Sequence, residues 1–199
     1  FLRLGIGFQT PTYYWNIQDS YNRQMISYYA DGHNSDIWSY DNDYNFSLTT
    51  PLKANLSASF IINKRGFIAA EYEFTDNSLA TMYSNDYGFE TENEAIVNKY
   101  GVCNTLRVGG EINLTSMFSL RLGYNFKSSP YKLQDAPYNA TAHYVTAGFG
   151  LRGQYFFFDM AYVYKYSKDS YWLYDSSYIN SGDITNATNR VVATVGWKF

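Results

Sequence analysis

The sequence predicts an all-β fold, an antiparallel up-and-down β-barrel of eight strands that spans a membrane. First, apolar and polar residues alternate in eight separate segments of the 199-residue chain, as they do in strands whose two faces meet different surroundings. Second, short and long connections alternate strictly between these segments, which places all the short ones at the same end of the sheet. Membrane-spanning β-barrels have this layout of short turns at one end and long loops at the other.

The predicted strands share an apolar face, expected against lipid, and a polar or small face, expected toward the interior of the barrel. Each has about the length of a tilted membrane-spanning strand, ~9–11 residues, and the second segment is the longest. That segment contains Pro51, which removes a ladder donor. Either the chain beyond about Thr50 rises above the membrane, or a kink there opens a gap in the wall. The alternating segments are Leu2–Phe8, Tyr44–Ile62, Ile68–Phe74, Leu106–Leu114, Phe118–Phe126, Val145–Leu151, Phe158–Tyr164 and Val191–Phe199.

The connections order these strands as a simple meander. Asn63–Gly66, Thr115–Ser116 and Gly153–Gln154 are turn-like and short. The other four links are long, and we expect them to be external loops. These long links are Thr10–Asp43, Thr75–Val102, Lys127–Ala142 and Ser167–Thr188.

Composition narrows the class of protein. Aromatic residues make up 20% of the chain, with 22 Tyr and 14 Phe, and no apolar run approaches the ~18 residues of a transmembrane helix. A net charge of −3 without a basic patch argues against nucleic acid as a partner. Two histidines and one cysteine predict no metal site, and no cofactor is expected. A soluble barrel or two-sheet sandwich with its apolar face inward fits the alternation too, but not the one-sided loops.

Several segments in this order resemble the FadL-type outer-membrane transporter family, in the form found in Bacteroidetes. The segments are Leu2–Tyr14, Leu48–Ala54, Asn104–Glu111, Leu120–Tyr124, Ser129–Lys132 and Phe156–Tyr162. The resemblance implies a barrel of about 14 strands with an N-terminal plug, in the bacterial outer membrane. Residues 1–199 would then be the C-terminal portion of a single barrel domain, although a small closed eight-stranded barrel is the alternative. The terminal strand, ending in Phe199, is similar to the signal that the barrel-assembly machinery reads in such proteins.

The resemblance also implies a function, the passive uptake of hydrophobic small molecules such as long-chain fatty acids. Outer-membrane lipids and lipopolysaccharide would surround the barrel. Two rival functions stay open: a non-transporting structural or adhesive barrel, and a lipid-modifying barrel enzyme. The enzyme would need Ser128 and His143 within hydrogen-bond reach on the outer surface. We predict no enzymatic activity, since no further motif accompanies that pair.

Candidate ligand-binding residues lie in two regions. Charged residues of the interior face are expected to pair with one another, since isolated buried charges are costly. Among them Arg107 and Arg121 are the best candidates for binding a fatty acid carboxylate, because a guanidinium can hold it with two parallel hydrogen bonds. In the external loops Tyr13, Tyr14 and Trp15 could capture an apolar ligand, although anchoring at the membrane interface or packing within the loop also explains such rings.

Overall fold

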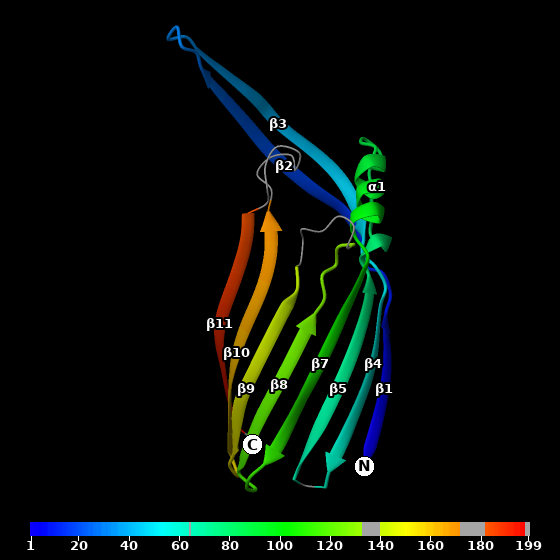
Figure 1. Cartoon of the computed structure of the whole chain (residues 1–199), viewed down its shortest axis with the longest axis vertical. Coiled ribbons are helices and arrows are strands. Elements are labelled where there is room, and N and C mark those ends of the chain that lie inside the picture. The colour runs from blue at the N-terminus through cyan, green and yellow to red at the C-terminus, as the bar shows by residue number, and fades with distance from the viewer. Residues whose placement is uncertain (64, 133–139, 172–181, 198–199) are drawn as a thin grey trace.

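The computed structural model describes residues 1–199 except 64, 133–139, 172–181 and 198–199, and gives no side-chain description for 22–23 and 38–42. Eight antiparallel strands form one curved sheet in the order β1-β4-β5-β7-β8-β9-β10-β11 (Figure 1). They are β1 (Leu2–Gln9), β4 (Lys53–Ile62), β5 (Gly66–Asp76), β7 (Val102–Asn113), β8 (Phe118–Lys127), β9 (Ala142–Arg152), β10 (Phe156–Tyr171) and β11 (Gly182–Trp197).

This order confirms the predicted eight-stranded meander. Each strand pairs with the next membrane strand along the chain, and β1 and β11 are the two edges of the sheet. The turns that join β4 to β5, β7 to β8 and β9 to β10 lie at one end, while the helix and the long hairpin lie at the other (Figure 1). The predicted separation of short turns from long connections is therefore present in the structure.

The two faces of the sheet differ as the alternation predicts. On one face, called the apolar face below, large side chains are freely accessible: Leu4 is 76% exposed, Leu122 69% and Val191 59%. Among the described residues only Phe89, Cys103 and Ala142 are buried apolar side chains. A soluble sandwich would bury its apolar face in a core. Because this face is uncovered, the arrangement suits lipid contact instead.

The predicted loop Thr10–Asp43 is instead part of a long hairpin. Strands β2 (Tyr13–Tyr28) and β3 (Asn34–Thr49) each have 16 residues and, with the short β6 (Thr81–Tyr83), form a separate three-stranded sheet. Figure 1 shows β2 and β3 extending well beyond the end of the eight-stranded sheet. We call this pair the outer hairpin. The sequence pattern did not predict this hairpin, because a hairpin that is exposed on both faces does not need alternating apolar and polar residues.

The predicted continuous strand Tyr44–Ile62 is wrong, since the chain leaves the sheet at Pro51. Strand β3 ends at Thr49 and β4 begins at Lys53. Pro51 has no backbone N–H and is unsuited to a paired strand interior. Beside it the Thr50 N–H donates to the Thr12 carbonyl, and the Thr12 N–H donates to Thr50 Oγ1, both at 2.9 Å. Residues before the proline thus belong to the outer hairpin, and residues after it belong to the main sheet.

The predicted loop Thr75–Val102 folds into a compact outer segment of η1 (Asn77–Leu79), β6 and α1 (Glu90–Lys99). Phe89, just before α1, is 6% exposed and its ring lies 5.7 Å from Phe46 and 4.9 Å from Tyr87. The Asn93 side chain accepts from the Met82 N–H and donates to the Met82 carbonyl, both at 2.9 Å. None of the helices in the described part of the chain is long and apolar enough to cross a membrane.

Asn93→Ala should loosen this outer segment without unfolding the sheet. The change removes both hydrogen bonds that tie α1 to the backbone of β6, at a cost of about 1–2 kcal/mol. We expect faster backbone hydrogen exchange in residues 77–99 and unchanged exchange in β7 and β8, measured by mass spectrometry. Asn98→Ala on the same helix is the matched control. Equal protection of residues 77–99 in both variants and the wild type would contradict this role.

Two other predicted links are only partly described. Strand β10 continues to Tyr171 and β11 begins at Gly182, so the described residues of the link predicted as Ser167–Thr188 are strand. Residues 172–181 within it, residues 133–139 of the Lys127–Ala142 link, and the terminal Phe199 lie outside the described residues. The proposed recognition of Phe199 by the assembly machinery therefore stays a prediction.

Candidate functional site

The face opposite the apolar one carries the charged residues of the sheet, and strand register aligns them in rows. Glu71 of β5 lies opposite Arg107 of β7, which lies opposite Asn125 of β8. Glu111 of β7 lies opposite Arg121 of β8 in the same way. We call this the polar face. Directly opposed residues on one face of an antiparallel pair interact, so the register itself brings acids and bases together.

Arg107 is the centre of a first charged cluster. Its Nη1 lies 2.5 Å from Glu71 Oε1 and 3.0 Å from Glu73 Oε2. The three side chains are partly exposed, Arg107 at 41%. One guanidinium therefore holds two carboxylates that stand two residues apart on the same strand, and the cluster keeps a net charge of −1.

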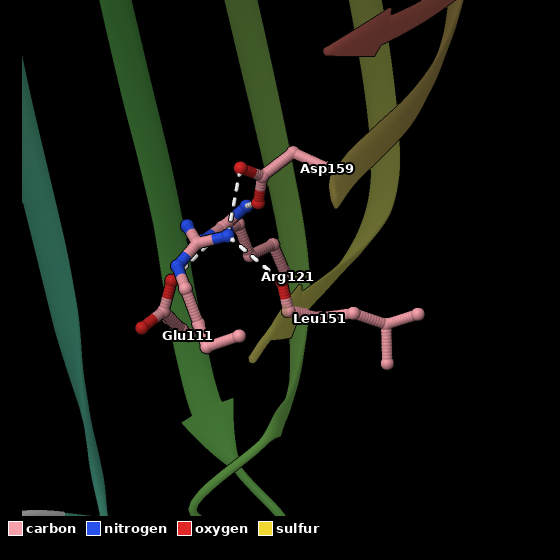
Figure 2. Close-up of polar contacts among 5 residues, drawn as sticks. Glu111, Arg121, Leu151 and Asp159 are labelled. Atoms are coloured by element: carbon pink, nitrogen blue, oxygen red, sulfur yellow. Dashed lines mark hydrogen bonds and ion pairs between the residues drawn. The ribbon is translucent and has the colours of Figure 1, made fainter. Parts of the chain in front are cut away.

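Arg121 is the centre of a second cluster nearer the short turns. Its Nε lies 2.5 Å from Glu111 Oε2 and its Nη1 lies 2.6 Å from Asp159 Oδ1 (Figure 2). Arg152 Nη1 completes the group at 2.8 Å from Asp159 Oδ2. Two positive and two negative side chains therefore form a neutral network that joins β7, β8, β9 and β10.

Glycine makes the second cluster possible. Arg121 and Asp159 are on β8 and β10, with β9 between them, and Gly150 of β9 lies opposite Asp159. A Cβ atom at Gly150 would lie 2.7 Å from Asp159 Oδ1, 2.8 Å from Ser119 Oγ and 3.3 Å from an Arg121 nitrogen. The bare backbone of β9 thus leaves the space through which the two side chains meet.

Gly150→Val should break this contact and destabilise the sheet. The branched side chain occupies the space of the Asp159 carboxylate, so one ion pair is lost and neighbouring side chains shift, at about 1–2 kcal/mol. Urea unfolding of the refolded protein in detergent measures the change. Gly182→Val is the matched control, because its nearest neighbour to an added Cβ is a backbone oxygen at 3.8 Å. Equal stability of the two variants would show that Gly150 has no such role.

A groove of about 480 Å³ lies on the polar face beside Arg107, across β1, β4, β5, β7, β8 and β9. Its floor consists of small residues, and its rim is charged or amide-bearing. The Oδ1 atom of Asn125 is buried there and has no hydrogen-bond partner among the described residues. Arg3 takes part in none of the ion pairs of the described part of the chain. We call this site the polar groove. The residues of the polar face that line it are Arg3, Gly5, Ser57, Ser59, Ala69, Glu71, Arg107, Gly109, Gly123, Asn125 and Thr146.

The predicted ligand-binding arginines therefore occupy different positions. Arg107 lines the polar groove, whereas Arg121 does not, and each is already bound to two carboxylates. Their role as ligand residues stays a prediction. Sequence reasoning singled out neither Asn125 nor Arg3 for binding. One feature of the sequence could have pointed to Arg3. It lies on the polar face, and the residue opposite it on β4 is Ser59 and not an acidic residue.

The three predicted aromatic residues lie at the base of the outer hairpin, far along the chain from the arginines. Tyr13 and Trp15 are 53% and 80% exposed, and their rings meet edge to face at 6.0 Å. Tyr14 lies opposite Leu48 and does not share the cleft that Tyr13 and Trp15 line. Further out, the Tyr87 hydroxyl donates to Glu92 Oε1 at 3.0 Å, and this bond to a carboxylate raises the pKa of the Tyr87 phenol.

Ser128 and His143 make separate contacts. Ser128 Oγ accepts from the Asn104 N–H at 2.9 Å, and His143 Nδ1 shares a hydrogen bond with the Tyr124 hydroxyl at 2.8 Å. The His143 ring also lies 5.1 Å from Phe126. This is the setting of an aromatic residue packed at the rim of the sheet. Among the described residues no group of three or more His, Cys, Asp or Glu side chains could hold a metal ion.

Comparison with solved structures places this geometry in a known fold. No protein-family model and no curated protein matches the sequence. The structure matches a FadL homologue from Pseudomonas aeruginosa with a TM-score of 0.52 and 16% identity, over 97% of this chain and 47% of that one. The fold is that of a FadL-type barrel. The toluene transporter TodX of P. putida matches with a TM-score of 0.50 and 12% identity, over 98% of this chain and 44% of that one.

The predicted FadL-type resemblance is thus confirmed at the level of fold. The chain spans about half the length of these two barrels. In a barrel of this fold we predict that the polar face lines the lumen and that the apolar face contacts lipid.

Proposed function

We propose that this chain forms part of the wall of an outer-membrane channel for the passive uptake of hydrophobic small molecules. The observation that carries the proposal is the match of nearly the whole chain to two FadL-type barrels, one of them a toluene transporter. The accessible apolar face and the charged lumen face agree with it. Channel proteins bind and orient their cargo, and we assign no covalent chemistry to this chain.

Within this function, long-chain fatty acids are our leading ligand class, and we place their carboxylate in the polar groove. Arg107 lines this groove but already holds Glu71 and Glu73. Arg3 lines the same groove and has a guanidinium outside the ion pairs of the described residues, so it is the better anchor. A fatty acid carboxylate would accept from Arg3, because Glu71 and Glu73 already neutralise the Arg107 guanidinium.

Arg3→Gln should weaken the binding of a fluorescent long-chain fatty acid to the full-length barrel in detergent by about tenfold, because a charged hydrogen bond is lost. Arg65→Gln, in a short turn at the end of the sheet, is the matched control and should bind as the wild type does. An unlabelled fatty acid should displace the fluorescent one. Toluene, which has no carboxylate, should bind equally well to the wild type and to Arg3→Gln. Saturable binding that Arg3→Gln leaves unchanged would move the carboxylate out of this groove.

The rival function is a non-transporting structural or adhesive barrel. The observation that favours it is that Arg107 and Arg121 each pair with two carboxylates, as expected of a braced lumen. Uptake of the fatty acid into liposomes that contain the full-length barrel separates the two functions. Uptake above that of empty liposomes supports the channel, and its absence supports the rival.

A further inference from the structure

A second concave site lies outside the barrel wall, where the base of the outer hairpin meets β6. It is a cleft of about 220 Å³, which we call the hairpin cleft. Two kinds of side chain line it: aromatic rings, and polar groups that include three amides, two hydroxyls and one carboxylate. The rings are Tyr13, Trp15, Phe46 and Tyr83, and the polar residues are Asn16, Asn45, Ser47, Ser84, Asn85 and Asp86.

Local backbone geometry places these groups together. The register of β2 and β3 shifts between Tyr14 and Ile17, which is a β-bulge, and Asn16 within it has a φ of 52°. Bulges re-aim side chains next to binding sites, and asparagine tolerates the left-handed region better than most residues. Trp15 and Asn16 therefore both line the cleft, although neighbours in a regular strand would point to opposite faces.

The polar groups are held in place from the β6 side. The Tyr83 hydroxyl donates to Asn85 Oδ1 at 2.8 Å, which engages the amide oxygen and leaves the N–H₂ group as the donor that Asn85 can offer a ligand. Ser84 Oγ donates to the Asn45 carbonyl at 2.6 Å and joins the segment that follows β6 to β3. The cleft is thus a braced feature shared by two segments of the outer sheet.

We propose that the hairpin cleft binds one ring of a neutral sugar. A sugar ring has a C–H face that stacks on an aromatic ring, and a rim of hydroxyls that both donate and accept hydrogen bonds. Trp15 at 80% exposure offers the stacking surface, Asn16 and Asn45 offer paired donors and acceptors, and Asn85 offers donors. This site lies on the hairpin, away from the lumen, and does not depend on the proposed transport.

Two properties of the lining exclude the nearest alternatives. An acyl chain or toluene would find few apolar partners there, because six of the ten lining residues are polar or charged. An anionic sugar or a phosphate would meet Asp86, the only charged side chain among the lining residues, all of which the structure describes. The volume lies below the ~300–1,000 Å³ of sites for drug-sized ligands, so it suits a single ring.

Saturation-transfer NMR on the full chain in detergent micelles tests the proposal. The probes are the methyl glycosides of glucose, galactose, mannose and N-acetylglucosamine. We expect transfer to the ring protons of at least one glycoside, with binding weakened about tenfold in Trp15→Ala because the stacking surface is lost. Asn85→Ala should weaken binding without removing the stacking signal. Tyr28→Ala, which removes an equally exposed ring from the far end of β2, is the matched control.

The outcomes distinguish a sugar of the cell's own envelope from a sugar outside the cell. They also distinguish failure of the hairpin cleft from failure of the carboxylate site in the lumen. Competition by a neutral polysaccharide released from bacterial lipopolysaccharide would identify the cell's own envelope as the source. Binding of a glycoside that this polysaccharide does not displace would identify a sugar from outside. No saturable binding of any glycoside, or equal binding by Trp15→Ala and Tyr28→Ala, would overturn the inference. Arg3→Gln should leave sugar binding unchanged, so failure of the lumen proposal is seen separately.

Discussion

Arg121→Glu should lower the free energy of unfolding of the barrel by about 2–4 kcal/mol at neutral pH. The change removes both contacts that Arg121 makes, at 2.5 Å to Glu111 and 2.6 Å to Asp159. It also places a third carboxylate beside these two, with Arg152 as the remaining cation of the cluster. Glu111 and Asp159 are only 20% and 23% exposed, so water screens the repulsion incompletely. Urea unfolding of the full-length protein in detergent measures the loss.

The pH dependence and a charge swap make this expectation specific. Repulsion requires ionised carboxylates, so acidification should bring the variant back toward the wild type, whereas a loss of packing would persist. The double variant Glu111→Arg, Arg121→Glu restores an opposed pair on β7 and β8 and should recover part of the stability. Arg65→Glu, at an exposed turn, should change stability by no more than ~0.5 kcal/mol. Equal unfolding of Arg121→Glu and Arg65→Glu would mean that the cluster contributes nothing.

The membrane strands were predictable because each lies between two different surroundings along its whole length. Lipid on one side and the lumen on the other impose a period of two, and the short turns then fix their order. The two faces of the outer hairpin have similar surroundings, so the sequence of Tyr13–Tyr28 contains no alternation that would predict a strand. The apolar alternation on both sides of Pro51 resembled one long strand, although the proline itself was the correct signal for the break.

The charged clusters were predictable as a class but not in their pairings. Glu111 and Arg121 flank a short turn, so their contact follows from a hairpin register that the sequence suggests. The contact between Arg121 and Asp159 crosses an intervening strand and depends on Gly150, which no pattern in the sequence connects to either residue. The hairpin cleft was hidden for a similar reason, because Tyr13 and Tyr83 are brought together by a sheet that the sequence did not predict.

Val191→Arg should destabilise the barrel in a bilayer by about 2–4 kcal/mol, the cost of a charge on the lipid face near the middle of a strand. Val191 is 59% exposed on the apolar face of β11, opposite Tyr162 of β10. Val192 is its neighbour, has the same side chain and lies on the polar face, where it is 47% exposed. Because a charge in the lumen meets water and other polar groups, Val192→Arg should cost less than ~1 kcal/mol.

The pair of valine variants also decides which face meets lipid. Reversible unfolding by guanidinium in phospholipid vesicles, followed through the electrophoretic shift between folded and unfolded barrel, gives both free energies in one assay. The two substitutions are identical in chemistry and adjacent in sequence, so propensity and size cancel in their difference. A larger loss for Val192→Arg would mean that the apolar face is covered by protein and the polar face is not a lumen. That result would contradict the proposed membrane orientation, the proposed carboxylate site and the proposed channel together. It would not affect the proposal for the hairpin cleft.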